Sequence, residues 1–148
     1  MSGSYFATLG VNALLGRVLT PADDELAGGP DGTAAVLSYT AWKRRFNGDA
    51  GAVGMHVLLD RAPVTIVGVL PPFFLGTEVG RTFDFFLPGR RASAVLSTTP
   101  FDQYSTWLNI IVRLKPGQTV ESSAAALRGL QPELRSTTRG VTNRRLST

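Results

Sequence analysis

The side chains best suited to chemistry in this sequence are His56, Glu78 and Arg81. They offer a base, an acid and an anion-binding group, provided that the fold brings them within hydrogen-bond reach in one cleft. No Gly-x-Ser-x-Gly motif accompanies the single histidine, which argues against a serine nucleophile. The remaining carboxylates are too scattered to nominate an acid/base pair; they include Asp23, Asp24, Glu25, Asp84 and Glu133. We therefore expect no catalytic residue and predict that the protein is not an enzyme.

The usual ligands of metals and cofactors are scarce. The chain contains no cysteine, which excludes disulfides and thiolate sites, and its one histidine makes a histidine-based metal site improbable. Two glycine-rich stretches, 48–54 and 76–81, could cradle a phosphate. The first follows a predicted helix and precedes a predicted strand, the reverse of the order that phosphate binding needs, and the second lacks the Gly-Lys-Ser/Thr ending. We predict turns at both, with Arg81 pairing with Glu78 or Asp84, and neither a metal nor a cofactor.

The net charge of +4 is unevenly distributed. The C-terminal end is basic, and no aromatic pattern accompanies its arginines, which are Arg135, Arg139, Arg144 and Arg145. We predict a poorly ordered basic tail at 137–148 and no nucleic-acid partner. No apolar run approaches the roughly 20 residues that span a bilayer, and the first residues lack the pattern of a secretory signal.

The hydrophobic periodicities predict short helices and strands in mixed order, which is typical of an α+β fold. The glycines Gly68, Gly76 and Gly80 are predicted to lie at constrained turns or bulges. Ser38 is expected to cap a helix whose face of Tyr39, Trp42 and Phe46 packs in the core. The expected helices are 5–9, 39–46 and one that follows Thr119, with a single turn near 20–24. The expected strands are 34–37, 54–60, 64–70, 83–87 and 107–114, and 61–63 is expected to connect the second to the third.

Several short stretches of the sequence resemble, in their order and spacing, the MacB-like periplasmic core domain of ABC-transporter permeases. This domain is FtsX-like in type. The stretches are residues 2–11, Gly16-Arg17, 35–38 with Trp42, Arg45 and Phe46, Gly54, 64–69, and 112–117. The stretch from Phe74 to Arg81, with Asp84 and Pro88, is similar to the variant found in duplicated orphan permeases of acidobacteria. The resemblance covers roughly residues 2 to 135.

The resemblance implies a two-lobed domain. Residues 1–52 and 89–136 would form a porter-like α/β lobe, and residues 53–88 a smaller strand-rich lobe inserted in it. Family members carry a transmembrane helix before this region and several after it, so the sequence is interpreted as a fragment, from a truncated or mis-started reading frame.

The resemblance also implies a function on the periplasmic side of the inner membrane. There the domain would relay conformational change for export or envelope mechanotransmission, with no catalysis of its own. Its implied partners are an ABC ATPase subunit, reached through the membrane part, a second permease copy, and an envelope protein. The alternative is a free-standing ligand-binding or adaptor module of the cell envelope, which predicts a pocket near Phe73, Phe74, Tyr104 and Trp107.

Overall fold

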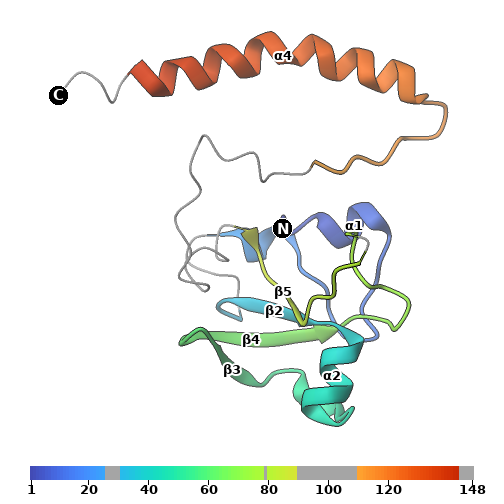
Figure 1. Ribbon diagram of the computed structural model, residues 1–148, viewed down its shortest axis with the longest axis vertical. Coiled ribbons are helices and arrows are strands. Elements are labelled where there is room, and N and C mark those ends of the chain that lie inside the picture. The colour runs from blue at the N-terminus through green and yellow to red at the C-terminus, as the bar shows by residue number, and fades with distance from the viewer. Residues whose placement is uncertain (26–30, 79, 90–109, 144–148) are drawn as a thin grey trace. The chain divides into compact units, whose positions relative to one another are not determined.

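A computed structural model describes residues 1–25, 31–78, 80–89 and 110–143; of Gln131 and residues 133–143 it describes the backbone alone. The chain divides into two compact units, Met1–Ile111 and Val112–Thr148. The first unit contains a mixed sheet with short helices, and the second contains one long helix (Figure 1). The predicted α+β class is therefore confirmed.

The sheet of the first unit is organised around its longest strand. Its strands are β1 (Leu15–Gly16), β2 (Ala34–Leu37), β3 (His56–Leu59), β4 (Ala62–Val69) and β5 (Phe85–Phe86). The order is β1-β4-β2-β5, and β3 also pairs with β4. Only the β2–β4 pair is parallel; the others are antiparallel. Because β4 belongs to the stretch 53–88 while β1 and β2 belong to 1–52, both stretches share this one sheet, and the division into two lobes stays a prediction.

Both faces of the sheet are covered, which explains why β2 and most of β4 read as unbroken apolar runs. On one face, Val36 and Val67 pack with Phe6 of α1 (Tyr5–Leu9). On the other, Leu37 and Ile66 pack with Trp42 of α2 (Tyr39–Phe46). The aromatic stripe of α2 is therefore core, as its helical spacing predicted.

The sequence predicted α2 with correct bounds because its two ends carry strong local signals. The Ser38 hydroxyl accepts a hydrogen bond from the Ala41 amide at 3.2 Å, and Asn47 ends the helix in the left-handed conformation. The Trp42 indole donates to the Asp49 carbonyl at 2.8 Å. That bond fixes the predicted turn at 48–54, which contains the short 3₁₀ helix η2 (Ala50–Ala52). A second 3₁₀ helix, η1 (Pro21–Asp24), begins with proline, as expected.

The hairpin between β3 and β4 turns one residue earlier than predicted. We expected the connection at 61–63, but Ala62 and Pro63 already belong to β4, opposite Leu59 and Leu58. The turn consists of Asp60 and Arg61, which have φ angles of 47° and 69°. Positive φ at both positions is the signature of a type I′ turn, whose twist matches the twist of the two strands. Nothing in the residue types announces it, since arginine rarely adopts this conformation.

Replacing Arg61 with glycine is expected to raise the free energy of unfolding by about 0.5 kcal/mol. The left-handed conformation costs a non-glycine residue roughly 1–2 kcal/mol, and the extra freedom of glycine in the unfolded chain offsets roughly 0.5–1 kcal/mol of that gain. Urea denaturation would measure the change. Arg61→Ala is the control, because alanine keeps the strain and should bring no gain. Equal effects of the two substitutions would contradict the turn geometry.

The predicted constraint on the backbone at Gly68, Gly76 and Gly80 is confirmed. Gly76 and Gly80 have φ angles of 102° and 79°. Gly68 pairs with Gly16 across β1 and β4, and a Cβ atom there would overlap the carbonyl oxygen of Arg17. The close approach of β1 to β4 therefore requires glycine at position 68.

The chain after residue 110 differs from its prediction in two places. Residues 110–114 form no strand in the described part of the chain, and 107–109 lie outside it, so the strand predicted at 107–114 is wrong where it can be seen. Alternation alone does not make a strand when no neighbouring strand supplies hydrogen bonds. Helix α4 (Val120–Asn143) begins after Thr119 as predicted, but it runs through Pro132 and past Ser136 into the predicted basic tail. Among the described residues, no helix combines the length and apolarity needed to cross a membrane.

Candidate functional site

His56, the most reactive candidate, is engaged in a structural hydrogen bond. It lies opposite Thr65 in the β3–β4 ladder, with its Nδ1 atom 3.0 Å from the Thr65 hydroxyl. That hydroxyl donates its only hydrogen to the Asp31 carbonyl at 2.8 Å. The Thr65 oxygen must therefore accept from His56, which assigns the proton of the neutral ring to Nδ1. His56 thus joins the two strands of the hairpin, and Thr65 holds the hairpin to the segment before β2.

Glu78 and Arg81 pair with each other on the surface. Their carboxylate and guanidinium lie 2.7 Å apart, and both side chains are largely exposed, which confirms this predicted pair. The Arg81 guanidinium also lies 5.3 Å from the centre of the Phe83 ring. Neither of the two depressions described below is lined by His56, Glu78 or Arg81. Within residues 1–25, 31–78, 80–89 and 110–143, no three His, Asp or Glu side chains gather as metal ligands would.

The first three residues are fastened to η1 and to the residues that follow β5, and we call them the N-terminal junction. The Met1 ammonium donates to the Leu87 carbonyl at 3.1 Å, and the Gly89 amide donates to the Met1 carbonyl at 2.5 Å. The Gly3 amide donates to the Asp24 carboxylate at 2.6 Å. Burial lowers the pKa of the Met1 ammonium, and the charge of Asp24 partly opposes that shift. The junction therefore joins the start of the chain to two segments remote in sequence.

Gly3 allows the backbone of the N-terminal junction to approach the backbone at the start of η1. A Cβ atom at this position would overlap the backbone carbonyl of Thr20 and would lie 2.7 Å from the Pro21 nitrogen. Only glycine lets the two backbones touch, and α1 begins two residues later. Displacement of the N-terminal junction must therefore move η1 as well.

A buried ion pair holds η1 to β1. Arg17 donates to both carboxylate oxygens of Asp23, at 2.8 and 2.9 Å, and the Asp23 side chain is 0% exposed. The Thr20 amide and hydroxyl donate to the same carboxylate at 2.7 and 2.9 Å. Arg17 also contacts Asp31 at 2.6 Å. Bidentate geometry with further donors is what a buried carboxylate requires.

The electrostatics of Asp23 follow from these partners. Burial by itself raises the pKa of this carboxyl, but the hydrogen bonds from Arg17 and Thr20 outweigh it and hold the pKa below its ordinary value. Sequence reasoning had counted Asp23 among carboxylates too scattered to form an acid/base pair, and it missed the ion pair with Arg17. One signal was present: Thr20-Pro-Ala-Asp23 has the spacing of a capping box, which the structure contains.

The segment 71–84 is fixed between the two helices. On the α1 side, the Phe74 ring lies 5.8 Å from that of Phe6, and the Tyr5 hydroxyl contacts Thr77 at 3.1 Å. On the α2 side, Asp84 binds Arg44 at 2.6 Å and Arg45 at 2.9 Å. The hydrogen bond from Arg45, and then the charge of Arg44, lower the pKa of Asp84 despite partial burial.

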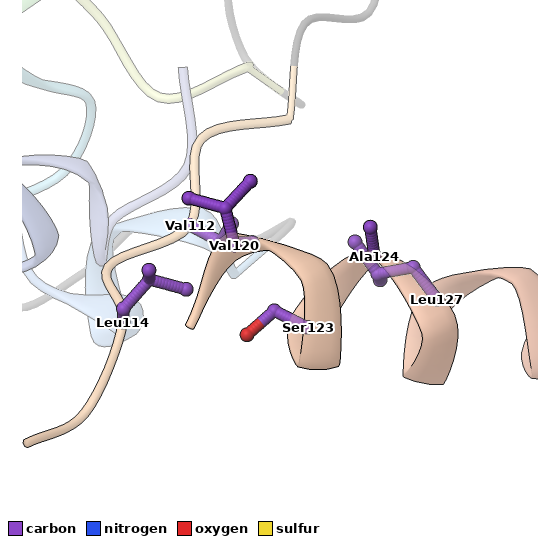
Figure 2. A pocket seen from close by; sticks show the side chains of 6 residues that line it. All are labelled: Val112, Leu114, Val120, Ser123, Ala124 and Leu127. Atoms are coloured by element: carbon purple, nitrogen blue, oxygen red, sulfur yellow. The ribbon is translucent and has the colours of Figure 1, made fainter. Parts of the chain in front are cut away.

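Each unit has one shallow depression. In the first unit, one of about 70 Å³ lies between α2 and the segment 71–84. In the second, a more open one of about 360 Å³ is lined by Val112, Leu114, Val120, Ser123, Ala124 and Leu127; Figure 2 shows their side chains beside the start of α4. The pocket predicted near Phe73, Phe74, Tyr104 and Trp107 stays a prediction, because Tyr104 and Trp107 lie outside the described residues. Of the other two, Phe73 is 78% exposed, and Phe74 packs against the core and also lines the depression of the first unit.

The comparisons with known proteins agree with the family that the short sequence stretches suggested. The chain matches the family model of the MacB-like periplasmic core domain over residues 1–130. No curated protein matches the chain. The matched region includes the sheet, the N-terminal junction, the Arg17–Asp23 pair and the beginning of α4. The chain belongs to the MacB-like periplasmic core domain family, whose members are domains of ABC-type permeases.

Proposed function

We propose that this domain acts as a passive mechanical relay on the periplasmic side of the inner membrane. It would pass conformational change between the membrane part of an ABC-type permease and the envelope, for export or mechanotransmission, without catalysis. Family membership supports a role in an ABC-type permease. The relay itself rests on one observation, the fastening of the N-terminal junction to η1 and to the residues that follow β5.

A relay requires that displacement at one end reach the rest of the domain without being absorbed by a flexible joint. The N-terminal junction meets this requirement, because backbone hydrogen bonds join Met1 to Leu87 and Gly89, and Gly3 joins Asp24. The Arg17–Asp23 pair then ties η1 to β1. The proposed partners are an ABC ATPase subunit, which would drive the membrane part, a second permease copy, and an envelope protein. We favour this function over a free-standing ligand-binding module because the chain belongs to a family of permease domains.

The test measures the rigidity of the junction with paired spin labels. The chain contains no cysteine, so Ser2→Cys and Ala50→Cys give a single labelled pair, and both positions are exposed. We expect a narrow distance distribution by pulsed electron paramagnetic resonance. Adding Gly3→Ala should broaden it, because the new Cβ forces the junction away from Thr20.

Gly129→Ala is the matched control, since a Cβ there meets no atom within 4 Å and should leave the distribution narrow. A broad distribution in the labelled parent chain would mean that the junction is a flexible joint, and the relay would have to be abandoned. The same conclusion would follow if Gly3→Ala left the distribution unchanged.

A further inference from the structure

The depression between α2 and the segment 71–84 combines apolar walls with a charged rim. Its walls include Tyr39, Leu75 and Phe83, and its rim carries Arg44 and Asp84. Thr82 and Ser38 add polar atoms to the lining. Leu75, Thr82, Phe83 and Asp84 come from the stretch 74–88, while Tyr39 and Arg44 come from α2 and Ser38 is its cap. The relay proposed above assigns no role to this feature.

The size of the depression indicates what kind of group fits. Small-molecule sites usually have volumes of roughly 300–1,000 Å³, whereas this depression has about 70 Å³. That volume suits one aliphatic side chain. A partner that inserts a single side chain is a peptide segment, because a free ligand of that size would gain little affinity.

The walls are held in place before any partner arrives. The Phe74 ring packs between those of Phe6 and Phe86, at 5.8 and 6.0 Å, so it anchors its neighbours in the chain. Those neighbours, Phe73 and Leu75, are 78% and 63% exposed. Leu75 lines the depression and so offers apolar surface to an inserted side chain. Rigid presentation also lowers the ordering cost of association.

The rim is electropositive, which selects the charge of the partner. Arg44 and Arg45 share the single carboxylate of Asp84, and their side chains are 58% and 53% exposed. One carboxylate neutralises one of two guanidinium groups, so the cluster keeps a net positive charge. An arginine that already binds one carboxylate still has free N–H donors for a second.

We propose that this depression is a docking site for an acidic peptide segment of a partner protein. The peptide would place one aliphatic side chain in the depression and a carboxylate against the Arg44–Arg45 pair. The inference rests on the proposed function, since a relay needs a partner to receive its motion. It can still fail independently, because peptide binding by this chain requires no rigid N-terminal junction.

The experiment measures the binding of three fluorescein-labelled pentapeptides to the full chain by fluorescence polarisation. The acidic apolar peptide, Glu-Glu-Leu-Glu-Glu, is expected to bind. Exchanging its leucine for serine, or its glutamates for lysines, should weaken binding about tenfold or more, because each change removes one of the two recognised groups. Amide shifts in NMR spectra should concentrate at Tyr39, Leu75 and Thr82.

Two variants locate the site. Arg44→Gln with Arg45→Gln should weaken binding of the acidic peptide about tenfold, and Leu75→Ser should weaken it without changing the net charge. Arg113→Gln with Lys115→Gln is the matched control, because it removes the same charge from exposed positions of the other unit. Thermal unfolding shows that each variant is folded; if the arginine variant is not, Leu75→Ser decides.

Three results would overturn the proposal. Equal affinity of parent, variants and control would place binding elsewhere. Equal binding of the lysine peptide would refute the charge argument. Sedimentation with phosphatidylglycerol vesicles that is lost in the Arg44/Arg45 variant, without binding of the acidic peptide, would identify a lipid surface as the occupant in place of a protein.

Discussion

Phe6→Ala is expected to lower the free energy of unfolding by about 3–5 kcal/mol. Phe6 is fully buried, and its ring contacts those of Tyr5, Phe74 and Phe86 at 5.2 to 5.8 Å. Truncation removes apolar burial and leaves a cavity that neighbours on three different segments cannot all collapse to fill. Small domains have a total stability of roughly 5–15 kcal/mol, so the variant would lie near the limit of folding.

Urea denaturation at equilibrium measures this loss, and Phe73→Ala supplies the matched control. Phe73 has the same side chain in the same segment as Phe74 but is 78% exposed, so its truncation should cost little stability. The cost at Phe6 should therefore exceed that at Phe73 several-fold. Comparable costs for the two substitutions would show that the aromatic cluster between α1 and β5 does not organise the fold.

Asp23→Ala is expected to cost about 1.5–3 kcal/mol, because it removes a charged acceptor and leaves the Thr20 donors without it, while the partly exposed Arg17 keeps Asp31. Asp31→Ala is the control. Asp31 contacts the same guanidinium, but its side chain is 42% exposed, and exposed pairs are worth about 1 kcal/mol or less. Chemical denaturation of both variants at neutral pH would measure the difference.

The pH dependence gives an independent check on Asp23. The pKa of Asp23 is lower in the folded state than its ordinary value, so its stabilising effect is present above the unfolded pKa and is lost as the pH falls through the folded pKa. The parent should therefore lose stability on acidification below about pH 4, and Asp23→Ala should lose less. Asp84, whose pKa is also lowered, keeps some of the slope in the variant. Identical slopes in parent and variant would contradict the buried pair.

The elements that sequence reasoning predicted well carry their signals locally. Ser38 and Asn47 bound α2 through a cap and a left-handed residue, and both signals depend only on neighbouring residues. Gly68 was recognised as constrained, although its reason, the overlap with Arg17, became visible only in the sheet. Local signals thus predicted the positions of helix ends and constrained glycines, but not the segments that pack against them.

The features that were missed depend on partners remote in sequence or on strained conformations. The Arg17–Asp23 pair forms because η1 folds back on β1, and six residues of separation do not suggest a bond. The Asp60–Arg61 turn was misplaced because arginine adopts positive φ there against its usual preference. The predicted strand at 107–114 failed for the opposite reason, since its alternation was clear but residues 110–114 have no sheet neighbour in the described chain.

The parallel pairing of β2 with β4 has a consequence for how the chain acquires its structure. β2 is synthesised first, but its partner is complete only after α2 and β3 have followed, so β2 must wait with its amides and carbonyls unpaired. The hairpin of β3 and β4 closes through two residues and needs no such wait. We expect the hairpin to form before β2 docks against β4, because the longer connection costs more entropy to close.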